Sequence, residues 1–159
     1  MNAERIVRLA ARGEGVTKSG RFVPMTAPGD LIAPDASIVP GPHHQVPLCR
    51  HFPECGGCQL QHVDDSAYAA YLQDRIASAL AAQGLPAPDI LNPRLSPPRS
   101  RRRATLKAAG GVVGFNAAAS HRIVDMRECH ILRPELFALV APLRRLLPGR
   151  AAAVLTLAD

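Results

Sequence analysis

The spacing of its four cysteines constrains this chain more than any other feature of the sequence. Cys49, Cys55 and Cys58 fall within ten residues, and Cys129 follows about 70 residues later. An even count would allow two disulfides, but the N-terminus shows no secretion signal, and disulfides are rare in reducing compartments. Three clustered thiols and one distant thiol are instead typical of a four-thiolate site that holds zinc or an iron–sulfur cluster.

The residues between Cys55 and Cys58 favour the cluster over zinc. Zinc ribbons usually carry two C-x-x-C pairs, whereas this chain has one, Cys-Gly-Gly-Cys. We expect Gly56 and Gly57 to take positive φ values and to bring backbone N–H groups close to the sulfur atoms, which a bulky inorganic cluster favours. Zinc and four unrelated buried thiols stay open as alternatives.

Histidines near the cysteines could in principle replace a thiolate. His51 and His62 flank the Cys-Gly-Gly-Cys segment, and His43 and His44 lie in a Pro- and Gly-rich stretch. Because four cysteines already complete a tetrahedral donor set, we expect each of these histidines to lie at the surface or beside the ligands.

Basic residues are concentrated in the second half of the chain. Residues 1–93 hold seven Lys or Arg against nine Asp or Glu, a net charge of −2, whereas residues 94–150 hold twelve against three, a net charge of +9. Such asymmetry is typical of a surface that binds a polyanion, because phosphate contacts release counterions. A solvated face without a partner is the alternative. Since no apolar run is long enough to span a membrane, we expect a cytoplasmic protein with no membrane partner.

The most basic stretch alternates as a β-strand does. From residue 101 on, one face carries Arg101, Arg103, Thr105 and Lys107, and the other carries Arg102, Ala104, Leu106 and Ala108. Gly110–Gly111 predicts a hairpin turn into residues 112–115, and we expect Leu106, Val112, Val113 and Phe115 to face a core. Arg101, Arg103 and Lys107 are the candidate RNA-binding residues, because cations in a row can follow a phosphate backbone. The alternative is an edge strand protected by charge against aggregation.

Turn and capping signals divide the rest of the chain. Residues 5–32 predict short strands that suit a small OB-like barrel, and residues 33–48 predict a linker. Asp65 or Ser66 is expected to cap a helix that ends at Gly84. Its apolar stripe is expected to pack in a core and consists of Tyr68, Leu72, Ile76, Ala79 and Leu80.

The C-terminal third is predicted to contain a strand, a helix and a second strand. Residues 122–126 predict a third strand of the basic sheet, and Pro134 begins a helix that stops at Pro148–Gly149. The apolar residues 151–157 begin a strand for which we expect the partner to lie in further residues. On this ground the chain is expected to be truncated.

Several of these motifs together resemble one family. They are C-x5-C-G-G-C, Gln59-Leu-Gln-His62, Arg101-Arg-Arg-Ala104, Gly114-Phe115, Ile123-Val-Asp125 and the final Cys129-x-Ile-Leu. In this order they resemble the iron–sulfur RNA uracil-5-methyltransferases, and most closely the bacterial 23S rRNA (uracil-5-)-methyltransferases of the RumA/RlmD type. The resemblance covers residues 5–157 but only the N-terminal part of a family member.

The resemblance implies an α+β fold in two parts. Residues 1–42 would form a shortened TRAM-type, OB-like β module with its linker. Residues 43–159 would form an incomplete central domain of antiparallel sheet and helices, with a 4Fe–4S cluster on Cys49, Cys55, Cys58 and Cys129. The family's Rossmann-like domain, which binds S-adenosylmethionine and carries the catalytic residues, would be absent from this chain.

The function implied is RNA binding on behalf of a methyltransferase that modifies C5 of a uridine. Structured RNA, preferably 23S rRNA and not DNA, would be the partner. No catalytic or S-adenosylmethionine-binding residue is assigned, because no Gly-rich loop opens a helix after a strand and all four cysteines are taken as ligands. The chain alone is therefore expected to be inactive. The alternatives are a stand-alone RNA-binding iron–sulfur or zinc module and a zinc-stapled scaffold without an RNA role.

Overall fold

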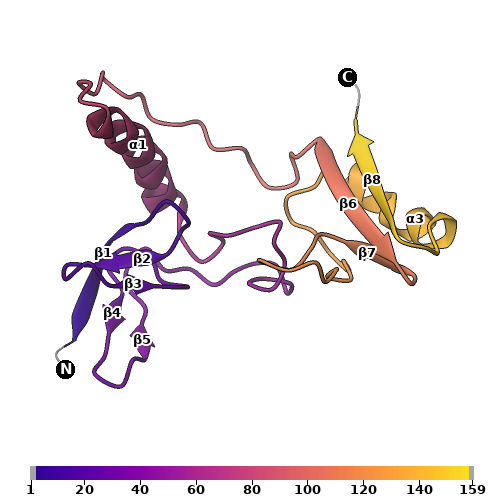
Figure 1. Cartoon of the computed structure of the whole chain (residues 1–159), viewed down its shortest axis with the longest axis horizontal. Coiled ribbons are helices and arrows are strands. Elements are labelled where there is room, and N and C mark those ends of the chain that lie inside the picture. Colours follow the sequence, from indigo (N-terminus) through magenta and orange to yellow (C-terminus); the bar gives the residue numbers. More distant parts are fainter. Residues whose placement is uncertain (1–2, 158–159) are drawn as a thin grey trace. The chain divides into compact units, whose positions relative to one another are not determined.

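The computed structural model describes residues 3–157 and divides into two compact units (Figure 1). We call residues 1–46 with 60–95 the N-terminal unit, and residues 47–59 with 96–159 the C-terminal unit. Within the described residues, the N-terminal unit combines an antiparallel sheet with one long helix, and the C-terminal unit combines an antiparallel sheet with two short helices. None of the helices in residues 3–157 is both long and apolar enough to cross a bilayer. The division does not test the domain boundary predicted at residues 42 and 43, which stays a prediction.

The N-terminal unit contains a five-stranded antiparallel sheet in the order β3-β2-β1-β4-β5. Its strands are β1 (Glu4–Leu9), β2 (Gly15–Thr17), β3 (Phe22–Val23), β4 (Leu31–Ile32) and β5 (Ile38–Val39). β5 pairs with β4 inside the stretch that we predicted to be only a linker, so that part of the prediction is wrong. No pairing between β3 and β5 closes the sheet within the described residues, and the OB-like barrel stays a prediction.

A buried carboxylate, Asp30, holds the end of this sheet together. Its Oδ2 accepts the backbone N–H of Ala27 at 2.8 Å and lies 2.8 Å from Nδ1 of His44, and its Oδ1 accepts the N–H of Gly41 at 2.7 Å. The side chain is fully buried. A buried carboxylate is tolerated only with such partners, so Asp30 fixes the path of the chain on both sides of β4 and β5.

The cap predicted for helix α1 (Asp65–Ala82) was Asp65 or Ser66, and the observed cap lies one residue before the first of these. Asp64 is the N-cap, and its carboxylate accepts the N–H of Ala67 at 2.8 Å. At the other end Gly84, at φ +68°, closes the helix as predicted, with its N–H on the carbonyl of Ala81 and the N–H of Leu85 on that of Leu80.

The predicted core stripe of α1 is only partly confirmed. Tyr68 and Tyr71 pack against a small core of the N-terminal unit made of Leu9, Ala27, Val63 and Ala67. Towards the C-terminal end of the helix the burial fades, and Ile76 is 52% exposed.

The C-terminal unit contains a three-stranded sheet in the order β7-β6-β8 (Figure 1). The strands are β6 (Arg103–Ala109), β7 (Val112–Gly114) and β8 (Ala151–Thr156). Ala109 pairs with Val112 across a two-residue turn, and Gly110 and Gly111 both have positive φ, so the predicted hairpin is confirmed. Residues 122–126 do not form the predicted strand and join residues 113–117 only through an isolated bridge and single hydrogen bonds.

β8 corrects two predictions. It pairs antiparallel with β6 over six residues, from Arg103 opposite Thr156 to Ala108 opposite Ala151, so its partner lies within the chain. β6 is consequently the central strand of its sheet. The alternative that its charges protect a sheet edge is therefore wrong for the described residues.

The predicted C-terminal helix is broken into α2 (Pro134–Ala138) and α3 (Val140–Leu146). Pro142 explains the break, because it has no N–H to donate to Ala138 and its ring crowds that carbonyl. Both helices pack on the buried face of β6. The core there consists of Ala104, Leu106, Ala108, Val113, Met126, Leu132, Leu136 and Val140.

We expect Asp30→Ala to lower the free energy of unfolding by about 1–3 kcal/mol for each buried N–H that loses its partner. Two backbone N–H groups depend on this carboxylate, the buried one of Ala27 and the partly buried one of Gly41, for which the loss should be smaller. The measurement is urea unfolding followed by circular dichroism. Asp35→Ala is the matched control, because Asp35 is exposed and its carboxylate accepts from the neighbouring Ser37. Equal losses from the two variants would contradict this role of Asp30.

Candidate cysteine site and nucleic-acid interface

All four cysteines lie in the C-terminal unit, and each is half-buried. Cys49, Cys55 and Cys58 lie on one loop that is folded by its own backbone. The N–H of Phe52 donates to the carbonyl of Cys49 at 3.1 Å, and the N–H of Cys55 donates to that of His51 at 2.8 Å. The sequence therefore folds the three clustered thiols into a compact loop.

This loop, which we call the cysteine loop (residues 49–58), docks on residues 115–118 through backbone hydrogen bonds. The N–H of Gly56 donates to the carbonyl of Asn116 at 2.9 Å, and the N–H of Ala118 donates to that of Glu54 at 3.0 Å. Glu54 also forms an ion pair with Arg122. The docking makes residues about 60 positions apart in sequence neighbours in space.

Gly56 and Gly57 are needed for this docking, but not for the predicted reason. Neither is among the glycines with positive φ, so that expectation is wrong. A Cβ on Gly56 would lie 2.8 Å from the carbonyl oxygen of Asn116, and one on Gly57 would lie 2.9 Å from Cδ2 of Phe115. The glycines therefore allow close approach. The backbone N–H of Gly57 lowers the pKa of the Cys55 thiol, although burial raises it more, and the expected approach of N–H groups to the sulfur atoms stays a prediction.

The segment before Cys129 is tied to the cysteine loop by two residues. The N–H of Arg50 donates to Oε1 of Glu128 at 2.7 Å, and its Nε lies 3.1 Å from Oε2. Nε2 of His51 accepts the N–H of Arg127 at 3.0 Å. His51 thus joins two backbone segments, whereas His62 belongs to the N-terminal unit, where it is buried with Nε2 3.3 Å from the carbonyl oxygen of Thr26.

The thiols influence one another electrostatically. Burial raises the pKa of Cys49, and the charges of Glu128 and Cys129 raise it further. Burial likewise raises the pKa of Cys55, with added repulsion from Cys49 and Cys129. A positive centre among these thiols would reverse that penalty, because a metal stabilises the thiolate.

The donor chemistry of the four thiols suits a thiolate-bound centre, but their arrangement is not a preformed ion site. Within residues 3–157, no three His, Cys, Asp or Glu side chains are gathered closely enough to hold a metal ion. The metal role of Cys49, Cys55, Cys58 and Cys129 therefore stays a prediction.

The predicted RNA-binding side chains lie on or beside β6. Arg103 is exposed and Lys107 is half-buried on the strand face that points away from the helices, and the exposed Arg101 precedes them. The backbone of Arg101 is fixed by residues 131–133, since its N–H donates to Ile131 and its carbonyl accepts from Arg133. The alternation predicted for residues 101–108 is confirmed by the buried Ala104, Leu106 and Ala108.

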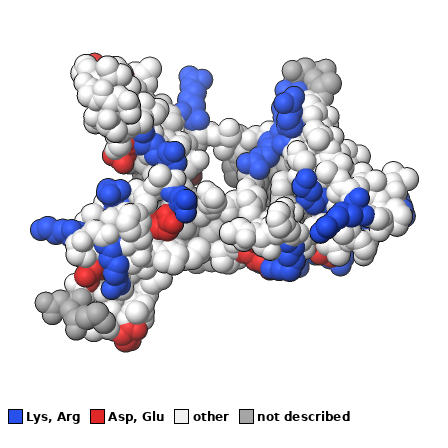
Figure 2. All heavy atoms as spheres, viewed as in Figure 1, with Lys and Arg blue, Asp and Glu red and all other residues white. Residues whose placement is uncertain are grey.

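Within residues 3–157, the acidic side chains of the C-terminal unit form no ion pair with these cations. Those in the described part of the unit pair with other arginines: Glu54 with Arg122, Asp125 with Arg127 and Arg144, Glu128 with Arg50, and Glu135 with Arg133. Figure 2 shows Lys and Arg side chains spread over the part of the molecule that holds β6 to β8, with the visible acidic side chains along its lower edge. The face can therefore attract a polyanion.

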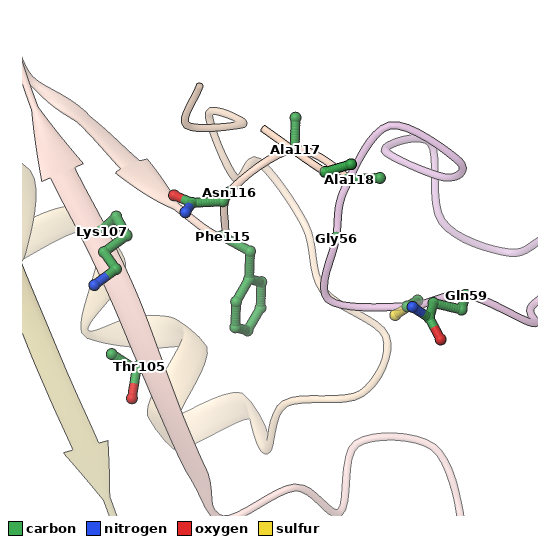
Figure 3. A pocket seen from close by; sticks show the side chains of 10 residues that line it. Gly56, Gln59, Thr105, Lys107, Phe115, Asn116, Ala117 and Ala118 are labelled. Carbon is green, nitrogen blue, oxygen red and sulfur yellow. The ribbon is translucent and has the colours of Figure 1, made fainter. Parts of the chain in front are cut away.

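A pocket of about 360 Å³ lies beside this face, between β6 and the cysteine loop (Figure 3). Thr105 and Lys107 line it from β6, and Gly56, Cys58 and Gln59 line it from the loop. The remaining wall is formed by residues 115–119. Figure 3 shows the ring of Phe115 extending into the space between β6 and the cysteine loop.

The sequence analysis missed this pocket. It assigned Phe115 to the core, and the side chain does pack partly against the core while also lining the pocket. Asn116 was not singled out at all. The motif Gly114-Phe115 was noted only as part of the family resemblance, and the structure shows why glycine stands there, since a Cβ on Gly114 would lie 2.0 Å from the carbonyl oxygen of Val124.

Comparison with known proteins finds relatives that are named RNA methyltransferases, although no family model matches the chain. An uncharacterized RNA methyltransferase of Zymomonas mobilis is 46% identical over 148 residues, which is 91% of this chain and 37% of that protein. The 23S rRNA (uracil(1939)-C(5))-methyltransferase RlmD of Thiobacillus denitrificans is 38% identical over 120 residues, covering 70% of this chain and 28% of the relative. The chain thus spans little more than a third of the length of its relatives.

A solved structure shows the same fold. The tRNA (uracil-54, C5)-methyltransferase of Pyrococcus abyssi, solved with S-adenosyl-L-homocysteine, matches with a TM-score of 0.57 at 24% identity, over 90% of this chain and 35% of the other. These matches confirm the resemblance inferred from the motifs. The chain belongs to the family of RNA methyltransferases that includes the 23S rRNA (uracil-C5) methyltransferases, and it corresponds to the N-terminal part of these proteins.

Proposed function

We propose that this chain forms the RNA-binding part of an S-adenosylmethionine-dependent methyltransferase that modifies C5 of a uridine in structured RNA, with 23S rRNA as the target. Methyl transfer itself is assigned to the remaining length of the relatives, so the chain alone is expected to be inactive. A uridine in folded RNA must leave its base stack before it can react. A separate surface that binds the surrounding RNA supports this step.

The uncompensated basic face of β6 carries the proposal. Arg103 and Lys107 project from a strand that is central in its sheet, and Arg101 directly precedes that strand, while the acidic residues in the described part of the unit pair with other arginines. Val154, opposite Thr105 on β8, is 67% exposed, so the face is open to solvent beside the cations. Cations on a rigid strand can bind successive phosphates at low entropic cost.

We further propose that Cys49, Cys55, Cys58 and Cys129 hold a 4Fe–4S cluster. When bound, the cluster supplies a covalent link between the cysteine loop and the segment that follows Met126. By the chain-entropy estimate for cross-links, closing a loop of about 70 residues would stabilise the fold by roughly 4 kcal/mol. Arg50 and His51 already hold the two segments together, which supports a structural role.

The double variant Arg101→Ala/Arg103→Ala is expected to weaken binding of a stem–loop RNA. The slope of log affinity against log salt concentration should become shallower by about one unit for each lost phosphate contact. Fluorescence anisotropy at several salt concentrations measures both quantities.

Arg145→Ala is the matched control, because Arg145 is exposed on α3, which packs against the opposite face of the sheet. It removes one arginine charge, half of what the double variant removes, and should leave the slope unchanged. A slope equally insensitive to both changes would mean that β6 does not touch the RNA.

Removal of one cysteine should remove the whole cluster. For protein purified without oxygen, we expect about four irons and four sulfides per chain in the native sequence, and almost none in Cys55→Ser or Cys129→Ser. RNA affinity and the unfolding temperature should fall together, because the cluster would stabilise the loop beside β6.

Iron, sulfide and zinc analysis with visible absorption is the measurement. One zinc per chain without colour would instead support the zinc site, and native protein with neither metal would contradict any four-thiol centre. Full iron content in Cys129→Ser would exclude the distant cysteine as a ligand.

A further inference from the structure

The pocket between β6 and the cysteine loop combines an aromatic ring with polar side chains that form no hydrogen bond or ion pair within residues 3–157. These side chains are those of Thr105, Lys107 and Asn116. Figure 3 shows the Asn116 carboxamide directed towards β6 and the Phe115 ring below it. Convergent polar groups around an apolar surface are typical of a binding site.

We propose that this pocket holds a single unpaired nucleotide of the bound RNA. Phe115 stacks on its base, the Asn116 carboxamide and Thr105 hydroxyl contact the edge of the base, and Lys107 binds its phosphate. The inference rests on the proposed RNA-binding function and adds a specific nucleotide subsite to it.

The ring of Phe115 is fixed in a way that suits stacking. The backbone of Gly57 lies so close to the ring that an added Cβ would be 2.9 Å from Cδ2 and 3.2 Å from Cε2. Part of the ring also packs against the core of the unit. A ring held on one side loses little freedom when a base stacks on its remaining surface, and stacking on aromatic side chains is the usual way in which unpaired bases are bound.

The polar groups match a nucleotide in chemistry and in placement. The carboxamide of Asn116 offers both donors and an acceptor, as the edge of a base does, and the hydroxyl of Thr105 can do either. Lys107 has three donors and no acceptor, so it suits a phosphate oxygen. Its position on β6 also continues the basic row of Arg101 and Arg103, so the pocket opens beside the proposed path of the RNA backbone.

The size of the pocket suits one nucleotide. A volume of about 360 Å³ lies at the lower end of the range of about 300–1,000 Å³ for small-molecule sites. The base must be unpaired, because a paired base has no exposed face and its edge is already engaged.

The test compares Phe115→Leu with Phe115→Tyr in the 159-residue chain, purified without oxygen, using single-stranded octauridylate RNA as the probe. Leucine keeps an apolar side chain for the core but removes the aromatic face, whereas tyrosine keeps the face. We expect Phe115→Leu to weaken binding by about 5- to 150-fold, the equivalent of one base stack. Phe115→Tyr should bind about as tightly as the native sequence.

The salt dependence separates stacking from a loss of structure or charge. Phe115→Leu should leave the salt slope unchanged, because no phosphate contact is lost, whereas Lys107→Ala should make it shallower by about one unit. Asn116→Ala should weaken binding without changing the slope. Thermal unfolding of each variant should remain close to that of the native chain.

Native protein that binds the RNA while Phe115→Leu binds equally well would overturn the pocket but leave the proposed function standing. Native protein that binds no RNA at all, even with its full iron content, would overturn both. Loss of binding in the tyrosine variant as well as in the leucine variant would also exclude stacking as the role of Phe115.

Discussion

The C-terminal unit depends on the docking of the cysteine loop against residues 115–129. Backbone pairing of Gly56 with Asn116 places one wall of the pocket, and the contacts of Arg50 and His51 place the segment before Cys129. Bringing together segments so distant in sequence has an entropic cost that backbone hydrogen bonds alone offset only in part. A cluster bound by cysteines of both segments would offset the rest of this entropic cost.

The electrostatic organisation follows from the same arrangement. Each acidic side chain in the described part of the C-terminal unit lies beside an arginine that holds a loop or helix in place, as Arg144 does with Asp125 and the carbonyl of Met126. The cations of β6 have no such structural task. Within residues 3–157, the ion-paired charges and the cations of β6 therefore lie on different elements, so a polyanion can bind the β6 cations without breaking an ion pair of the fold.

Local patterns in the sequence predicted local structure well. The alternation of residues 101–108, the turn at Gly110–Gly111 and the end of α1 at Gly84 all depend on neighbours within a few residues, and all are confirmed. The partner of β8 was missed because it lies on β6, far earlier in the sequence. The short pairing of β5 with the neighbouring β4 was missed because the Pro- and His-rich composition around it indicated a linker. The break between α2 and α3 was missed because the prediction followed the regular leucine spacing and did not consider Pro142.

The candidate site was predictable in its parts rather than as a whole. The cysteines and the basic row are recognisable by residue type and spacing. The pocket is not, because it forms only where the Cys-Gly-Gly-Cys segment meets Phe115 and Asn116, and no periodicity encodes that meeting.

The path of the chain between its two units has a consequence for synthesis on the ribosome. The cysteine loop belongs to the C-terminal unit, yet residues 60–95 return to the N-terminal unit before the rest of the C-terminal unit follows. At about 5–20 residues per second, Cys129 is made roughly 4–14 s after Cys58. During that delay Cys49, Cys55 and Cys58 lack residues 115–118, on which their loop later docks, so oxidants and stray metal ions can reach these thiols in the nascent chain.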